Sequence, residues 1–150
     1  NRPDKLDGDI KRPGRLDRKI PFFYCDTAAE RVQVLQAVLS RYEEPCVAST
    51  EELLTLCDTL TGYSNADLEA LSLLAVELAR NQATPLNADA LTQAAADFMP
   101  PQERDMIEFM ELLAVSETSR RSMLPKRYRD MAIADIQSNL IAAKRRALTR

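Results

Sequence analysis

The stretch Arg12-Pro13-Gly14-Arg15-Leu16-Asp17-Arg18 stands near the start of the chain and places three arginines at spacings of three around a Pro-Gly pair. Pro13 fixes φ and Gly14 permits a left-handed turn, so the stretch predicts a loop and not the interior of a helix. A loop that presents Arg15 and Arg18 is suited to bind phosphate, because guanidinium groups are rigid and permanently charged donors. The alternative is a solvated basic turn that pairs with the neighbouring aspartates.

Three further segments extend this pattern in both directions along the chain. They are Asn1-Arg2-Pro3-Asp4, the apolar run Lys19-Ile20-Pro21-Phe22-Phe23-Tyr24, and Thr61-Gly62-Tyr63-Ser64-Asn65-Ala66-Asp67-Leu68. Together with the arginine stretch they resemble the AAA ATPases, the classical clade of the AAA+ superfamily. That family has Asn-Arg-Pro-Asp after its sensor-1 strand, then Arg-Pro-Gly-Arg-x-Asp-Arg, and Gly-x-Ser-Gly-Ala-Asp-Leu at the start of a lid helix. The resemblance covers residues 1 to about 98.

The resemblance implies catalytic roles for three residues. Arg15 and Arg18 match the arginine fingers, which reach across a subunit boundary to the γ-phosphate of a neighbour's nucleotide. Asn1 matches the sensor-1 residue, whose amide would contact the γ-phosphate or orient the attacking water. Arg12 would brace the loop.

The resemblance also implies a nucleotide-facing turn at the start of the lid helix. Gly62, Ser64, Asn65 and Ala66 match the segment that places backbone against the edge of the adenine. Asn65 stands where the family has glycine, and Val38 stands where it often has a histidine near the ribose. The alternative for the turn is a helix C-cap followed directly by an N-cap.

The family implies an enzyme that uses ATP and magnesium, assembles as a ring of six with neighbouring AAA subunits and remodels a macromolecule. The sequence contains three glycines and no Gly-x-x-x-x-Gly-Lys-Ser/Thr phosphate loop. No strand ending in paired acids, which would hold magnesium, precedes Asn1. We therefore expect the C-terminal fragment of a longer ATPase, cut just before the sensor-1 asparagine, which binds no ATP or magnesium and is inactive by itself.

The composition is typical of a soluble globular protein. The 150 residues are 45% hydrophobic and 29% charged, and the apolar runs are short, so we expect neither a transmembrane helix nor a signal peptide. The chain has no histidine and three irregularly spaced cysteines, Cys25, Cys46 and Cys57. This pattern argues against a zinc site and against a disulfide framework, and it favours a cytoplasmic protein with reduced thiols.

The charges are segregated along the chain. Residues 1–20 hold seven basic and four acidic side chains, residues 21–118 hold four basic and seventeen acidic ones, and residues 119–150 hold nine basic and two acidic ones. Basic ends around an acidic middle favour either head-to-tail contact between subunits or internal pairing. The basic tail also supports an alternative function, a non-catalytic helical module that binds protein or nucleic acid. No aromatic interleaving or reader motif accompanies it, which argues against nucleic acid.

Capping signals and apolar periodicity predict a mostly α fold with a four-helix lid over residues 27–98. Thr27 with Glu30, Ser49 with Glu52 and Ser64 with Asp67 are capping boxes, and Asn87 is a further N-cap. The first helix should end near Glu44, before a proline, and the fourth near Phe98.

The remaining residues divide into an N-terminal remnant of an α/β nucleotide-binding domain, 1–26, and a family-specific extension, 99–150. We expect a strand at Lys19–Tyr24, poorly anchored without its sheet. In the extension we expect helices over 102–116 and from Asp130 to about 148, laid against the lid. Glu108 and Glu111 should lie on a solvated helix face.

Overall fold

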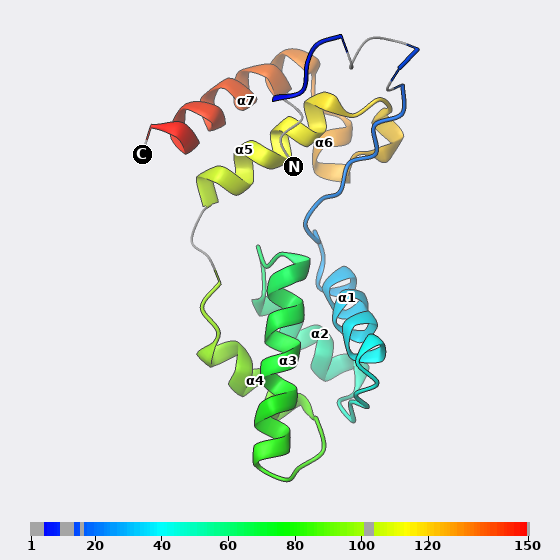
Figure 1. Cartoon of the computed structure of the whole chain (residues 1–150), viewed down its shortest axis with the longest axis vertical. Helices are drawn as coiled ribbons and strands as arrows, with labels where there is room; N and C mark the ends of the chain where they lie inside the picture. The colour runs from blue at the N-terminus through cyan, green and yellow to red at the C-terminus, as the bar shows by residue number, and fades with distance from the viewer. Residues whose placement is uncertain (1–4, 10–13, 16, 101–103, 150) are drawn as a thin grey trace. The chain divides into compact units, whose positions relative to one another are not determined.

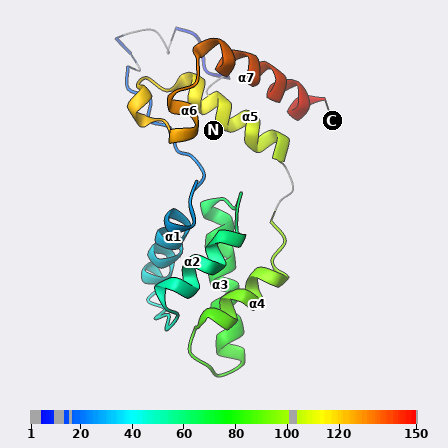
Figure 2. The same cartoon turned by 180° about the vertical axis from the view of Figure 1, so that it is seen from behind.

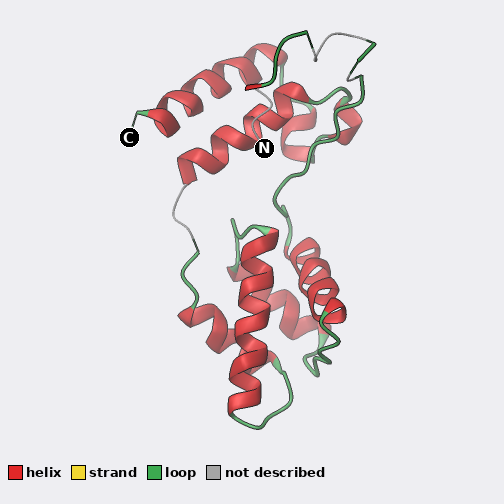
Figure 3. Cartoon of the chain, viewed as in Figure 1, coloured by secondary structure: helices red, strands yellow, loops and turns green. Residues whose placement is uncertain are grey.

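The computed structural model describes residues 5–9, 14–15, 17–100 and 104–149, and in Figure 1 the chain forms two units. The central unit consists of the described residues of 24–101, and the terminal unit joins those of 1–23 to those of 102–150. The boundaries drawn from the sequence, at 26/27 and 98/99, stay predictions. All regular elements of the described residues are helices, as Figure 3 shows, which confirms the predicted mostly α fold class.

The central unit contains the four predicted helices, α1 (Ala28–Arg41), α2 (Thr50–Thr59), α3 (Asn65–Asn81) and α4 (Ala88–Asp97). The first three begin at complete capping boxes, and α4 begins at Asn87, whose side chain accepts from the Ala90 amide at 2.9 Å. Each cap satisfies backbone donors that the first turn of a helix leaves without a partner. The predicted starts of these helices are therefore confirmed.

Helix α1 ends at Arg41, three residues before the predicted end near Glu44. Tyr42 is its C-cap, and Glu43 leaves the helical conformation with a left-handed φ of 56°. The amide of Glu44 then donates to the carbonyl of Leu39 at 2.9 Å, the closing bond of a Schellman motif. Ala83 does the same after α3, with φ 53° and a bond from the Thr84 amide to the Ala79 carbonyl.

The core of the central unit lies where the apolar stripes of the four helices meet. Helix α1 packs on α2 and α3, while α4 packs on α3 and α2 (Figures 1 and 2). The loops that follow α1 and α3 meet in a parallel bridge between Cys46 and Leu86. The largest fully buried side chains in the core of the central unit are Leu35, Leu68, Leu71, Leu91, Cys57 and Ser72.

The terminal unit is built on two antiparallel helices, α5 (Arg104–Glu117) and α7 (Ile133–Leu148), seen side by side in Figures 1 and 2. Phe109, 1% exposed, and Ala143 lie in their contact. Between them the chain forms a 3₁₀ turn, η2 (Arg121–Met123), and the short helix α6 (Lys126–Arg129). None of the helices in the described part of the chain combines the length and apolar character that a membrane crossing requires.

Three expectations for the terminal unit were wrong. Lys19–Tyr24 forms no strand, and its residues run in an extended path. Asp130 does not begin the last helix, because it caps the C-terminus of α6, and α7 starts after Ala132 without a side-chain cap. Glu111 is not solvated: its carboxylate pairs with Arg127 and accepts from the Tyr128 hydroxyl at 3.0 Å. Burial raises the pKa of this carboxyl.

Candidate functional site

The predicted arginine loop forms a turn in the terminal unit. Gly14 has φ 88°, the left-handed region that glycine enters without strain. Its amide donates to the Asp17 carboxylate at 2.6 Å, which closes a turn that contains Arg15. Arg15 and Arg18 are both exposed, and one guanidinium nitrogen of Arg15 donates to the carbonyl of Asp9 at 3.3 Å. Asn1 and Arg12 lie outside the described residues.

The second predicted site is the turn between α2 and α3, which we call the lid corner, residues 60–67. Gly62 has φ 86°, and the amide of Tyr63 donates to the Leu60 carbonyl at 3.3 Å. The Ser64 hydroxyl accepts from the Asp67 amide at 3.0 Å, and the Asp67 carboxylate accepts from the Ser64 amide at 2.8 Å. Ser64 is thus a helix cap, and its predicted contact with nucleotide stays a prediction.

Asn65 and Ala66 form the first turn of α3 at this corner. Both are exposed, so the start of the helix presents small and polar groups to the outside. Apart from Gly62 itself and its two neighbours in sequence, no described residue has an atom within 4 Å of the position that a Cβ on Gly62 would occupy. Gly62, Asn65 and Ala66 are therefore exposed at this corner, and the Ser64 cap fixes the start of the helix; their predicted contact with nucleotide stays a prediction.

The conformation of Gly62 leads to a stability prediction. Gly62→Ala should destabilise the chain by about 1–2 kcal/mol, because an alanine in the left-handed region brings its Cβ too close to the following carbonyl. Urea unfolding of the 150-residue chain measures this change. Gly8→Ala is the matched control, since Gly8 also has open space around it and has no positive φ. Equal stability of the two variants would contradict the strain assigned to Gly62.

A buried arginine connects the end of α2 with the segment before α1. Arg31 of α1 is 2% exposed, and its Nε donates to the Cys57 carbonyl at 2.7 Å while Nη1 donates to the Cys25 carbonyl at 3.1 Å. The Cys57 carbonyl lies in the last turn of α2 and also accepts from the Leu60 amide at 3.3 Å. Arg31 therefore ties the segment that enters the central unit to the end of α2, next to the corner.

The sequence analysis missed Arg31, although the sequence held a signal for it. Arg31 stands three residues after Ala28 and four before Leu35, both on the apolar stripe of α1. A charged residue at such a position is buried only if its donors find acceptors.

The cysteine that precedes α1 also touches the corner. The Cys25 thiol donates to the Asn65 side-chain oxygen at 3.7 Å. Burial raises the pKa of the Cys25 thiol, with Glu30 adding to the shift and Arg31 opposing it, and burial likewise raises the pKa of Cys57. The raised pKa values argue against either thiol acting as an activated thiolate nucleophile.

One aromatic contact connects the corner with the end of α4. The rings of Tyr63 and Phe98 lie 6.0 Å apart between centroids and are tilted by 44°. Burial raises the pKa of the Tyr63 hydroxyl, and the nearby Asp67 carboxylate adds to the shift. Tyr63 thus packs on the C-cap residue of α4, while Arg31 binds the last turn of α2 that leads into the corner.

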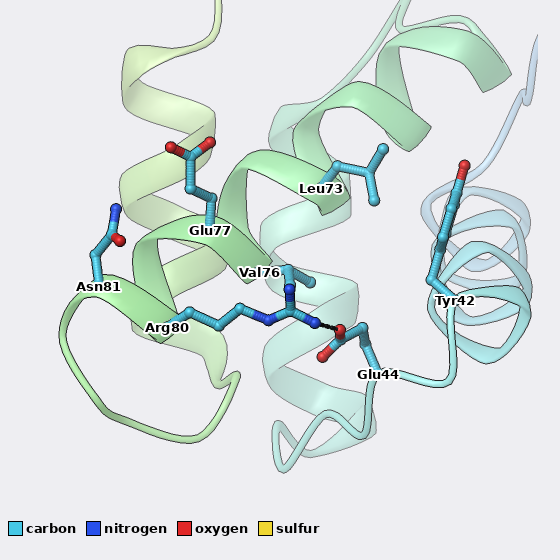
Figure 4. A pocket seen from close by; sticks show the side chains of 7 residues that line it. All are labelled: Tyr42, Glu44, Leu73, Val76, Glu77, Arg80 and Asn81. Carbon is cyan, nitrogen blue, oxygen red and sulfur yellow. Dashed lines mark hydrogen bonds and ion pairs between the residues drawn. The ribbon is translucent and has the colours of Figure 1, made fainter.

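A separate hollow of about 350 Å³ opens in the central unit between the end of α1 and α3 (Figure 4). Leu73 and Val76 supply apolar surface, and Arg80 forms an ion pair with Glu44 across it, marked in Figure 4. The sequence analysis did not anticipate this hollow, because it depends on the loop after α1 reaching α3. Its lining residues are Tyr42, Glu44, Leu73, Val76, Glu77, Arg80 and Asn81.

The described residues show no set of side chains suited to hold a metal. No group of three or more cysteine, aspartate or glutamate side chains that could bind an ion occurs among them. We therefore assign no magnesium ligand within the described chain.

Comparison with known proteins gives several relatives that are named ATPases. The human ATPase family gene 2 protein homolog B is 31% identical over 121 residues, which cover 77% of this chain. The peroxisomal ATPase pex1 of Schizosaccharomyces pombe is 42% identical over 72 residues, and an ATPase family AAA domain-containing protein of Arabidopsis thaliana is 37% identical over 71, each covering 47% of the chain.

The chain spans only a small part of these relatives, 16% of the human protein, 7% of the yeast protein and 6% of the plant protein. No family model and no solved structure matches the chain.

Proposed function

Because this chain belongs to the AAA ATPase family, we propose that it supplies two parts of ATP-hydrolysing sites, the arginine fingers Arg15 and Arg18 and a helical lid. The observation that carries the proposal is the order of the two signatures, the arginine loop followed by the lid corner. Both occur in a chain that is 31% identical to an ATPase over 121 residues. The assembly would contain neighbouring AAA subunits, since a finger acts on the nucleotide of the next subunit.

The arginine loop suits this task through its charge and its exposure. In phosphoryl transfer, negative charge develops on the transferred group, and a guanidinium can stabilise it without proton transfer. Arg15 lies within the turn closed by Asp17 and Arg18 follows it, and both are exposed, so they can contact a group outside their own chain. This geometry supports a role in trans.

The lid corner suits the adenine end of the nucleotide. A left-handed glycine followed by the exposed Asn65 and Ala66 lets backbone approach a flat ring, and the Asn65 amide offers both a donor and an acceptor. ATP would supply the phosphoryl group. Magnesium would neutralise part of the negative charge of the phosphates, and we place none of its ligands in this chain. The proposed activity is remodelling of a macromolecule driven by ATP.

The 150-residue chain alone should not hydrolyse ATP, because its sequence contains no phosphate loop to hold the β- and γ-phosphates. A coupled assay of phosphate release from the purified chain should give the rate of buffer. The full-length protein, assayed in parallel, should be active and should require magnesium. Turnover that stays with the 150-residue chain through further purification, or an inactive full-length protein, would contradict the proposal.

A further inference from the structure

A single hydroxyl holds the chain on both sides of Arg18. The Lys19 amide donates to Ser119 Oγ at 3.1 Å, and Ser119 Oγ in turn donates to the Asp17 carbonyl at 3.0 Å. The hydroxyl therefore uses its donor and one of its acceptor positions on the two residues that flank Arg18. We call Asp17, Lys19 and Ser119 the Ser119 clasp. In Figures 1 and 2 the segment 17–23, in blue, runs beside α6 of the same unit.

Two further contacts hold the same segment on the terminal unit. Lys19 Nζ pairs with Glu117 Oε2 at 2.6 Å, with side chains only 31% and 21% exposed. The ring of Phe23 lies 6.2 Å from that of Tyr128 and packs on the apolar cluster that includes Val115. The segment predicted to be poorly anchored is thus attached at both of its ends.

The clasp extends to the turn that carries Arg15. The backbone of Asp17 is held by Ser119, and the carboxylate of the same residue accepts from the Gly14 amide at 2.6 Å. Asp17 thus connects Ser119 with the residue directly before Arg15. Both proposed fingers are within one residue of a backbone group that this network fixes.

We propose that Ser119 is a positioning residue for Arg15 and Arg18, acting through Asp17 and Lys19. The inference rests on the proposed function, and it gives the helices of 104–149 a role in catalysis. A finger must place its guanidinium within hydrogen-bond distance of a phosphate oxygen, and a misplacement of about 1 Å can cost roughly 10² in rate. Without the Ser119 hydroxyl the loop keeps its arginines and loses their fixed position.

The test compares serine variants in the full-length ATPase. Ser119→Ala should lower kcat about tenfold with little change in KM for ATP, because the finger acts on a neighbour's nucleotide. Ser119→Thr keeps the hydroxyl and should restore most of the activity. Ser116→Ala is the matched control, since the Ser116 hydroxyl donates only to the Leu113 carbonyl of its own helix, and its kcat should equal that of the natural protein.

Two more measurements separate positioning from general stability. In the 150-residue chain, Ser119→Ala should speed hydrogen exchange of the Lys19 amide, while Ser116→Ala should not. In the full-length ATPase that already carries Arg15→Ala and Arg18→Ala, adding Ser119→Ala should lower kcat no further, because residues that act as a unit are not additive.

The outcomes distinguish this inference from the proposed function. Loss of activity in Arg15→Ala and Arg18→Ala, with normal kcat in Ser119→Ala, would overturn the inference and leave the fingers in place. A low kcat in Ser119→Ala with unchanged Lys19 exchange would also overturn it, since the effect would not pass through the clasp. Normal turnover in the arginine variants themselves would overturn the proposed function.

Discussion

In the full-length ATPase, replacing Arg15 or Arg18 by alanine is expected to lower ATP turnover by about 10³-fold, the lower end of the effect of an arginine finger. ATP affinity should change little, because each arginine would act on the nucleotide of the neighbouring subunit. Both side chains are exposed, and neither contributes to the apolar core of its unit, so folding should be preserved. Steady-state kinetics measures the loss of turnover, and a separate nucleotide-binding measurement checks that the ATP affinity is unchanged.

A matched control and a mixing experiment complete this test. Arg145→Ala removes another exposed arginine, in the last turns of α7, and should leave turnover unchanged. A subunit with Arg15→Ala should regain activity when it is mixed with a subunit that lacks a working phosphate loop, since one composite site in each mixed pair is then complete. Near-normal turnover of either arginine variant would show that this residue is not a finger.

The second large effect should come from Arg31→Met, which is expected to lower the free energy of unfolding by about 3 kcal/mol. Hydrogen bonds to a charged donor contribute roughly 1.5–3 kcal/mol each, and Arg31 donates to the carbonyls of Cys25 and Cys57 in a site where it is 2% exposed. Methionine fills much of the volume but leaves both carbonyls without this donor. Urea unfolding of the 150-residue chain, followed by circular dichroism, measures the difference.

Arg80→Met provides the comparison for Arg31. The Arg80 side chain is 71% exposed and forms a surface ion pair with Glu44, so its loss should change stability by no more than about 1 kcal/mol. Similar losses in the free energy of unfolding for the two variants would mean that the buried hydrogen bonds of Arg31 stabilise the chain little more than a surface ion pair does.

The central unit could be predicted from sequence because its helices are specified locally. Thr27, Ser49 and Ser64 each stand three residues before an acidic side chain, and each capping box forms in the structure. The lid corner was predictable for the same reason, since its geometry depends on Gly62 and on the cap directly after it. Local rules were sufficient where the partner of a group lies within a few residues.

The terminal unit could not be predicted in the same way, because its contacts join residues far apart in sequence. We expected a strand at Lys19–Tyr24 because its residues favour β structure. In the structure, Lys19 instead contacts Ser119 and Glu117, and Phe23 contacts Tyr128. Asp130 seemed to be an N-cap, yet the preceding Pro125 starts the short helix α6, whose end Asp130 caps. Tertiary contact decided these cases over local propensity.

The discontinuous make-up of the terminal unit has a consequence for synthesis on the ribosome. Lys19 and Ser119 are 100 residues apart, so the partner of the arginine segment leaves the ribosome roughly 5–20 s later at ordinary rates of translation. The central unit lies wholly between these two parts, and its helices have short-range contacts, so it can fold during this interval. The nascent arginine segment must therefore wait for its final partners, and the terminal unit can form only after the central unit has left the ribosome.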